Sequence, residues 1–283
     1  MKKLFLSIIA TMFFISTASA VELILPVKPG GGTHRTGMKI QAALADSQGI
    51  KAELKFTGSC KVAEKMWNDA TGETIMLANA SLWATGCNLG TNIKDNEYVV
   101  LVKAMEHAIC RASDNPTLTL DKFLNPSISK IVGSSYTLVN SMKSILEDTG
   151  NKSSKVVNFG NSRKLKVAAT TKDADYWYMT VADGHRMKNL TCIATVGSGA
   201  GGQHGPLLKD VAPNVKVPVA MNADMIIVKN SNRTDELRKM FGNAVKDKNY
   251  VAWLKASGLI DVSNYSREQF LSLIPGFRAT WTK

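Results

Sequence analysis

The stretch that determines the predicted fold is Leu23-Ile24-Leu25-Pro26-Val27-Lys28-Pro29-Gly30-Gly31-Gly32-Thr33-His34-Arg35. Its apolar start belongs to residues 21–26, which predict a short buried strand. The prolines and glycines predict a turn, and residues 34–46 follow a helical pattern for which Thr33 is the expected cap. Several backbone N–H groups and a helix N-terminus meet in such a turn, which suits a carboxylate or a phosphate. The alternative is a tight turn whose glycines serve only the backbone.

Strands and helices alternate along the rest of the chain. Further strands are predicted at residues 51–56, 74–78, 98–105, 108–111, 130–132, 156–159, 175–181 and 191–196. Helical patterns lie between several of them, and the last third is mostly helical, with expected caps at Thr234 and at Ser266, where Gln269 completes a capping box. This alternation predicts an α/β fold with mostly parallel sheets.

Two later turns have the same strand, polar turn and helix setting. One contains Gly133, Ser134, Ser135 and Thr137, and the other contains Gly160, Asn161 and Ser162. Either turn alone is more often a helix cap than a ligand site. Three such turns in one α/β chain raise the chance that they converge on one cleft.

The first twenty residues predict an export signal. Lys2 and Lys3 precede an apolar stretch at residues 4–15, and Ala18-Ser19-Ala20 has the small residues of a cleavage site. The apolar stretch is too short to span a bilayer, although an N-terminal membrane anchor is the alternative reading. We expect cleavage after Ala20 and an exported mature chain. The 283-residue chain carries a formal net charge of +12, which favours acidic partners.

The four cysteines are Cys60, Cys87, Cys110 and Cys192, and no pair has the C-x-x-C spacing of a redox or zinc motif. In an oxidising compartment an even number of cysteines predicts one or two structural disulfides. The spacing alone leaves all three pairings open.

Enzyme and nucleic-acid templates do not fit. The histidines His34, His107, His185 and His204 lack metal-ligand spacing, and no H-E-x-x-H or G-x-S-x-G motif occurs. We therefore predict no catalytic residue, no metal and no cofactor. An exported chain without a dense basic and aromatic stripe is not expected to bind nucleic acid. The pair Asp173 and Asp175 is expected in a turn, and residues 197–202 are expected to form a flexible surface loop.

The order of elements and the first turn resemble the Bug-type periplasmic solute receptors of tripartite tricarboxylate transporters. Residues 26–33 match the family's P-x-x-P-G-G-x-T-D turn, but His34 stands where the family usually has Asp. The likeness continues through residues 133–137 and 159–162. It ends in a similar tail, with a strand near Val228, a helix after Thr234, a helical pair around residues 252–258 and the helix after Ser266.

The resemblance implies a type II, Venus-flytrap fold of two α/β lobes joined by two crossing strands. Lobe 1 would comprise residues 21–105 and 223–283, and lobe 2 residues 106–222. Such receptors bind small carboxylates between the lobes and deliver them to membrane permease subunits. The expected ligand-binding residues are Pro29, Gly30, Gly31, Gly32, Thr33, His34, Gly133, Ser134, Ser135, Thr137, Gly160, Asn161 and Ser162. By the same resemblance, Cys110 and Cys192 lie on neighbouring strands of lobe 2, which leaves Cys60 to pair with Cys87.

The leading functional hypothesis is a monomeric binding protein for a small organic anion. The family likeness and the anion-suited turns favour a mono-, di- or tricarboxylate. A receptor of the same fold that serves a sensor instead of a permease is one alternative. A secreted α/β hydrolase is another, which the missing nucleophile motif disfavours.

Overall fold

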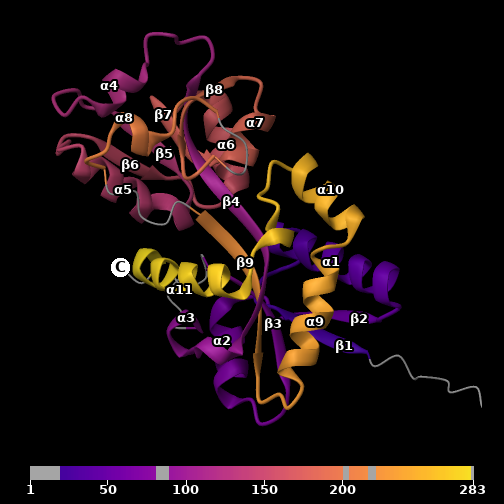
Figure 1. Cartoon of the computed structure of the whole chain (residues 1–283). Helices are drawn as coiled ribbons and strands as arrows, with labels where there is room; N and C mark the ends of the chain where they lie inside the picture. Colours follow the sequence, from indigo (N-terminus) through magenta and orange to yellow (C-terminus); the bar gives the residue numbers. More distant parts are fainter. Residues whose placement is uncertain (1–19, 81–88, 200–203, 216–220, 282–283) are drawn as a thin grey trace, which may run out of the picture.

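The computed structural model describes residues 20–80, 89–199, 204–215 and 221–281. The predicted signal peptide lies almost wholly outside this range. Within it, no helix is both long enough and apolar enough to cross a membrane. Figure 1 shows two groups of helices and strands, an upper and a lower one, connected by two long strands.

The first sheet has the strand order β2-β1-β3-β9-β4. The strands are β1 (Val21–Leu25), β2 (Ala52–Phe56), β3 (Thr74–Asn79), β9 (Met221–Lys229) and the first part of β4 (Tyr98–Ala112). The strand β1 pairs in parallel with β2 and β3, whereas β9 is antiparallel to both β3 and β4. The last strand in the chain, β9, thus lies between β3 and β4, two strands from the first 112 residues.

The second sheet is built around the other part of β4. It contains β5 (Ile131–Ser134), β6 (Lys155–Asn158), β7 (Tyr176–Thr180) and β8 (Leu190–Val196). The strand β5 pairs in parallel with β6 and β7, and β4 lies antiparallel between β7 and β8. Every pairing made by β4 or β9 is antiparallel, so the prediction of mostly parallel sheets was wrong in this respect. The two crossing strands, β4 and β9, are thus antiparallel to the strands with which they pair in each sheet.

The sequence pattern predicted two strands where the structure has β4 as one strand. Glu106 and His107 interrupt its apolar run, yet both side chains are buried. Up to Glu106, β4 pairs with β9, and from His107 onward it pairs with β7 and β8. The strand therefore changes sheet at this point. The lobe limits at residues 105 and 223 remain a prediction, which this change of partners supports.

Helices cover both faces of the sheets. In the first group they are α1 (Gly32–Gln48), α2 (Cys60–Asp69), α3 (Leu89–Asn92), α9 (Thr234–Ala244), α10 (Lys248–Ala256) and α11 (Arg267–Trp281). In the second group they are α4 (Leu120–Leu124), α5 (Val139–Asp148), α6 (Ser162–Thr171), α7 (Val181–Arg186) and α8 (Leu208–Val211). Figure 1 shows α1, α9 and α10 to the right of the crossing strands and α2, α3 and α11 to the left.

Two predicted caps have different outcomes. Ser266 and Gln269 form the expected capping box, since each side chain accepts the other residue's backbone N–H, at 3.2 Å and 2.8 Å. Thr234 is instead the first residue of α9, and its hydroxyl donates to the carbonyl oxygen of Ser231. The prediction of Thr234 as N-cap was therefore wrong by one residue.

The disulfide predicted between Cys110 and Cys192 is present. The two residues are directly opposite each other on β4 and β8. The helix α7 lies against the bond at Gly184, where an added Cβ would approach the sulfur of Cys192 to 2.5 Å. Glycine is therefore needed for α7 to pack this closely. Cys87 lies outside the described residues, so its pairing with Cys60 stays a prediction.

Replacing Cys110 and Cys192 together with alanine should lower the free energy of unfolding by about 2–5 kcal/mol, because the bond restrains the unfolded chain. Urea denaturation of the oxidised wild type and the double variant measures this difference. An unchanged denaturation midpoint would show that the bond does not stabilise this lobe.

Candidate functional site

The C-terminal ends of strands from both sheets meet where β4 and β9 cross between them. In the first sheet, Asn79 at the end of β3 is opposite Asp224, which is opposite Lys103. In the second sheet, Thr180 and Val196, at the ends of β7 and β8, are both opposite His107. Lys103 and His107 are four residues apart, or about 13 Å along an extended strand. The loops that follow these strands therefore border one region between the sheets.

The glycine turn (residues 29–33) occupies this region from the first sheet. Gly31 is the N-cap of α1, and no side chain accepts a hydrogen bond from the first turn of the helix in the manner of a cap. Thr33, predicted as the cap, is instead the second helical residue and is buried. Pro29, Gly30, Gly31 and Gly32 are exposed. The first N–H groups of a 17-residue helix are thus open to an acceptor from outside.

His34 holds the shape of this turn. Its Nδ1 accepts the backbone N–H of Gly30 at 2.8 Å, and its ring packs edge-on against Phe56 with the ring centroids 4.9 Å apart. Gly30 has a φ of 102°, which favours glycine. A ring nitrogen that accepts a hydrogen bond carries no proton. In this geometry His34 supports the turn, and its Nδ1 is occupied by the Gly30 N–H and not directed at a ligand.

A buried polar cluster lies directly beneath the turn, and the sequence analysis missed it. The ammonium group of Lys103 pairs with Asp224 at 2.5 Å, and the Thr36 hydroxyl donates to the same carboxylate oxygen at 2.9 Å. Asn79 donates to the other oxygen. A Cβ on Gly32 would be 3.8 Å from Nζ of Lys103. A cation therefore lies under the open N–H groups of α1.

The second and third predicted loops are neighbours in the structure. The N–H of Tyr136 donates to the carbonyl oxygen of Gly160 at 2.5 Å, and the N–H of Phe159 donates to that of Ser134 at 3.0 Å. Ser134 and Ser135 are buried at this junction. The Thr137 side chain is outside the described part of the structure. These two loops thus form one edge on the second sheet.

Three predicted residues in these loops have clear structural roles. An added Cβ on Gly133 would approach the Trp177 ring to 2.5 Å, so Gly133 provides space for this tryptophan. Asn161 caps α6, since its Oδ1 accepts the N–H of Lys164 at 3.0 Å. Gly160 has a φ of 82°, which the turn before α6 requires. The structure thus brings Gly160, Asn161 and the exposed Ser162 to the loop edge without showing a ligand contact.

Glu106 holds the loop after β8 against the crossing strands. Its Oε1 accepts hydrogen bonds from the Ser198 hydroxyl at 2.6 Å and the Gly199 N–H at 3.1 Å, and also from the Ser198 N–H. Ser198 is exposed and outside any helix or strand, in keeping with the surface loop predicted at residues 197–202, and the hydrogen bonds to Glu106 hold Ser198 and Gly199 against β4. Residues 200–202 lie outside the described range. The charged residues inside an apolar predicted strand were the sequence signal for these buried polar contacts.

His107 belongs to a buried hydrogen-bonded chain on the other side of the crossing. Its Nδ1 is 3.2 Å from the hydroxyl of Tyr178, which is 3.1 Å from that of Ser141. Burial lowers the pKa of His107 to about 3. It also raises the pKa of Tyr178 well above its usual value. Both side chains are therefore neutral at physiological pH.

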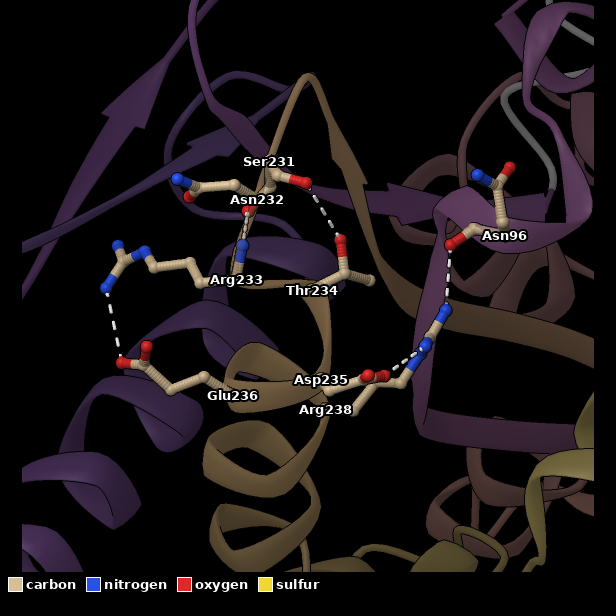
Figure 2. A pocket seen from close by; sticks show the side chains of 8 residues that line it. All are labelled: Asn96, Ser231, Asn232, Arg233, Thr234, Asp235, Glu236 and Arg238. Atoms are coloured by element: carbon tan, nitrogen blue, oxygen red, sulfur yellow. Dashed lines mark hydrogen bonds and ion pairs between the residues drawn. The ribbon is translucent and has the colours of Figure 1, made fainter.

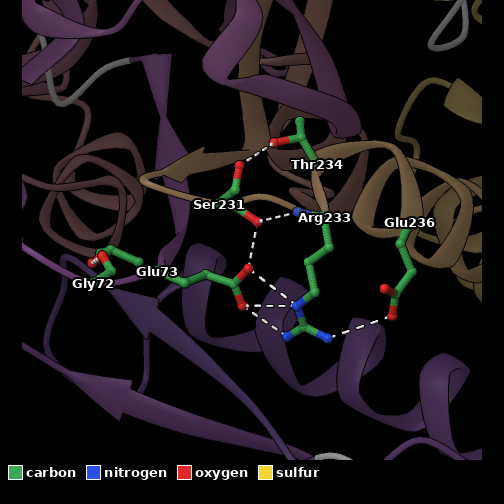
Figure 3. Close-up of polar contacts among 7 residues, drawn as sticks. Gly72, Glu73, Ser231, Arg233, Thr234 and Glu236 are labelled. Carbon is green, nitrogen blue, oxygen red and sulfur yellow. Dashed lines mark hydrogen bonds and ion pairs between the residues drawn. The ribbon is translucent and has the colours of Figure 1, made fainter.

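A surface hollow of about 490 Å³ lies elsewhere, at the far end of β9 (Figure 2). It is lined by charged and polar residues that already pair with one another. Arg238 contacts Asp235 and the carbonyl oxygen of Asn96. Figure 3 shows Arg233 holding Glu73 through two guanidinium nitrogens, which fastens the start of β3 to the start of α9. These contacts stabilise the end of the sheet, and the hollow is remote from the crossing.

The described residues contain no group of three or more His, Cys, Asp or Glu side chains that could hold a metal ion.

Asp175 accepts the backbone N–H of Ile131 at 2.7 Å, in keeping with its predicted place in a turn.

The chain has two α/β lobes that are joined by antiparallel crossing strands, and loops from both lobes meet at the crossing. This is the fold of the two-lobed solute-binding proteins. Solved structures agree. The chain is similar to a TctC solute-binding protein from Polaromonas, with 16% identity and a TM-score of 0.71 over 93% of this chain and 96% of that one. It is similar to MatC from Rhodopseudomonas palustris with bound malate, with 12% identity and a TM-score of 0.66 over 93% and 97%.

The periplasmic binding protein BugD is also similar, with 14% identity and a TM-score of 0.65 over 93% of this chain and 95% of that one. The predicted resemblance to Bug-type receptors is thus confirmed at the level of the fold. Neither a scan against protein-family models nor a search of curated proteins found a match.

Replacing Lys103 with Met should lower the free energy of unfolding by about 3–5 kcal/mol, because it leaves the buried Asp224 carboxylate without a cation. Asp224→Asn should also destabilise the protein, since it leaves a buried ammonium group unpaired. The double variant should be more stable than the sum of the single losses predicts. Urea denaturation of all four proteins provides this cycle, and strictly additive losses would contradict a coupled pair.

The ion pair of Glu73 and Arg233 should make a pH-dependent contribution to stability. Hydrogen bonds from Arg233 lower the pKa of Glu73 from its usual 4.5, so the contribution is present above pH 4.5 and is lost as the pH falls through the folded-state pKa. At pH 7, Glu73→Gln should cost about 1 kcal/mol, since both groups are partly exposed. The difference from wild type should shrink toward pH 3 in urea titrations, and a constant difference would argue against the pair.

Proposed function

We propose that this protein is a periplasmic solute-binding receptor that captures a small mono-, di- or tricarboxylate between its two lobes and delivers it to membrane permease subunits. The observation that carries the proposal is the glycine turn, whose exposed helix N-terminus lies above the Lys103 ammonium group. Backbone N–H groups and a buried cation together suit a carboxylate.

The turn would grip a carboxylate through the N–H groups of Gly31, Gly32 and Thr33. Ser134, Ser135 and Thr137 would face the ligand from the other lobe, with the loop of Gly160, Asn161 and Ser162 beside them. Closure of the lobes would bring these loops together around the ligand, since they follow strands that end at the same crossing. Backbone N–H donors do not titrate, so their hydrogen bonds to the anion would persist across physiological pH.

The comparisons support a binding role over a catalytic one, since the similar structures are solute-binding proteins and one of them holds malate. An export signal cleaved after Ala20 would place the mature chain in the periplasm. We propose that it acts as a monomer, because in this fold one chain supplies both lobes around the ligand. Lobe limits at residues 105 and 223 accord with the change of sheet by β4 at Glu106 and His107.

Gly31→Asp should weaken carboxylate binding about tenfold to a hundredfold, because it places a negative charge where the ligand carboxylate would sit. The backbone tolerates the change, since Gly31 has a φ of −85° and open space at its Cβ position. Aspartate is also a favourable N-cap, so the fold should be preserved.

The steric control is Gly31→Ala, which adds a Cβ without charge and should bind close to wild type. Wild type should first be screened by thermal shift against mono-, di- and tricarboxylates; a ligand at a hundred times its Kd raises the unfolding free energy by about 2.7 kcal/mol. Calorimetric titration of both variants with the best ligand then gives the affinities. Equal affinity of Gly31→Asp and wild type would remove the glycine turn from the site.

A further inference from the structure

Between the two sheets, β4 and β9 present a shared face that we call the crossing face, made of Lys103, Met105 and His107 on β4 and Asn222 and Asp224 on β9. Lys103 is opposite Asp224, and Met105 is opposite Asn222. Directly opposite residues of an antiparallel pair share a face, and so do alternate residues of one strand. Asn222 therefore lies midway between the ion pair and His107.

The crossing face lies against the candidate site. The Lys103 ammonium group is 3.8 Å from the position of a Cβ on Gly32, and Thr36 of α1 donates to Asp224. At the other end, Tyr178 connects His107 to Ser141 of α5, the helix that follows the second loop. Asn222 thus lies between the elements that carry the two loops.

Polar atoms on this face lack partners among the described residues. They are Oδ1 of Asn222 and Nε2 of His107, in side chains that are 9% and 1% exposed. Lys103 has three N–H donors, and the contact shown for it is the one with Asp224. Buried polar groups without partners are costly and uncommon in folded proteins. Their grouping on one face between two lobes indicates a place for an outside molecule.

The chemistry of these atoms specifies the missing group. With the Asn222 amide in the orientation of the structure, its unpartnered oxygen accepts, so the partner of this oxygen must carry an O–H or N–H group, which a carboxylate lacks; the amide nitrogen remains a donor. His107 is neutral, and its Nε2 donates or accepts according to the tautomer that Tyr178 selects. A hydroxyl group can satisfy Asn222 as a donor and still accept another hydrogen bond. An ammonium group fits poorly, because Asp224 is already bound by Lys103, Thr36 and Asn79.

We propose that Asn222, supported by His107, recognises a hydroxyl group of the bound carboxylate, so that the receptor selects hydroxycarboxylates over their deoxy and amino analogues. Lys103 and the glycine turn would take the carboxylate, and the hydroxyl group would lie toward Asn222. Residues two apart on a strand are about 6.6 Å apart, a spacing that a small acid can span. This inference rests on the proposed function, because it requires a carboxylate in the site.

The test uses three four-carbon acids that differ at one position: L-malate with a hydroxyl group, succinate with hydrogen and L-aspartate with an ammonium group. The pairs citrate and tricarballylate, and lactate and propionate, extend it to other lengths. Calorimetric titration of the wild-type mature protein should show that, in the set that binds, the hydroxy acid has a Kd about tenfold to a hundredfold lower than its analogues.

Asn222→Leu should reduce this preference to within about threefold by weakening hydroxy-acid binding while leaving deoxy-acid binding nearly unchanged. The matched control is Asn249→Leu, which replaces an exposed asparagine on α10 and should keep the wild-type preference. If Asn222→Leu fails to fold, Asn222→Ser and the wild-type selectivity still provide the test.

Each other outcome overturns the inference. Equal binding of succinate and malate would show that the unpartnered atoms hold water, and tighter binding of aspartate would show that the site reads an amine; both leave the proposed function intact. An unchanged preference in Asn222→Leu would assign the hydroxyl contact to another residue. Failure of every carboxylate to bind would remove the proposed function and the inference together.

Discussion

The rest of the structure depends on the buried ion pair of Lys103 and Asp224 on the two strands that cross between the lobes. Two charges without solvent require close partners on every side, because an unpaired buried charge is strongly unfavourable. Thr36 and Asn79 supply those partners from α1 and β3. The cluster thereby fixes the start of α1 and the end of β3 to the crossing. The glycine turn is positioned as a result.

The loops of each lobe are held by contacts within that lobe. The glycine turn is held by its own contact between Gly30 and His34 and by the cluster below it. On the other lobe, the two loops are held to each other by backbone hydrogen bonds. The lobes are joined through β4 and β9. A ligand that contacts both loops would couple them, which is the physical basis of capture between lobes.

The charges at the crossing also explain why a basic chain need not have an exposed basic patch at its site. Lys103 is neutralised by Asp224, yet its ammonium group remains beside the helix N-terminus, so the local field still favours an anion. Glu106 is on the opposite face of β4, where its carboxylate accepts hydrogen bonds from Ser198 and Gly199. Its negative charge is therefore directed away from the glycine turn. Charge placement along one strand thus gives the crossing two chemically different faces.

The sequence by itself determined the alternating α/β elements, the glycine turn, the capping box at Ser266 and, through the family likeness, the disulfide of Cys110 and Cys192. These features follow from local periodicity, turn chemistry and a family pattern. Only the tertiary structure decided that β4 is one strand, that Lys103 pairs with Asp224, and that Asn222 and His107 share a face. The reason is distance along the chain, since Asp224 meets Thr36 across 188 residues and Asn79 across 145. A charged residue within an apolar strand is a local signal of burial, but its partner is set by how the two lobes are joined.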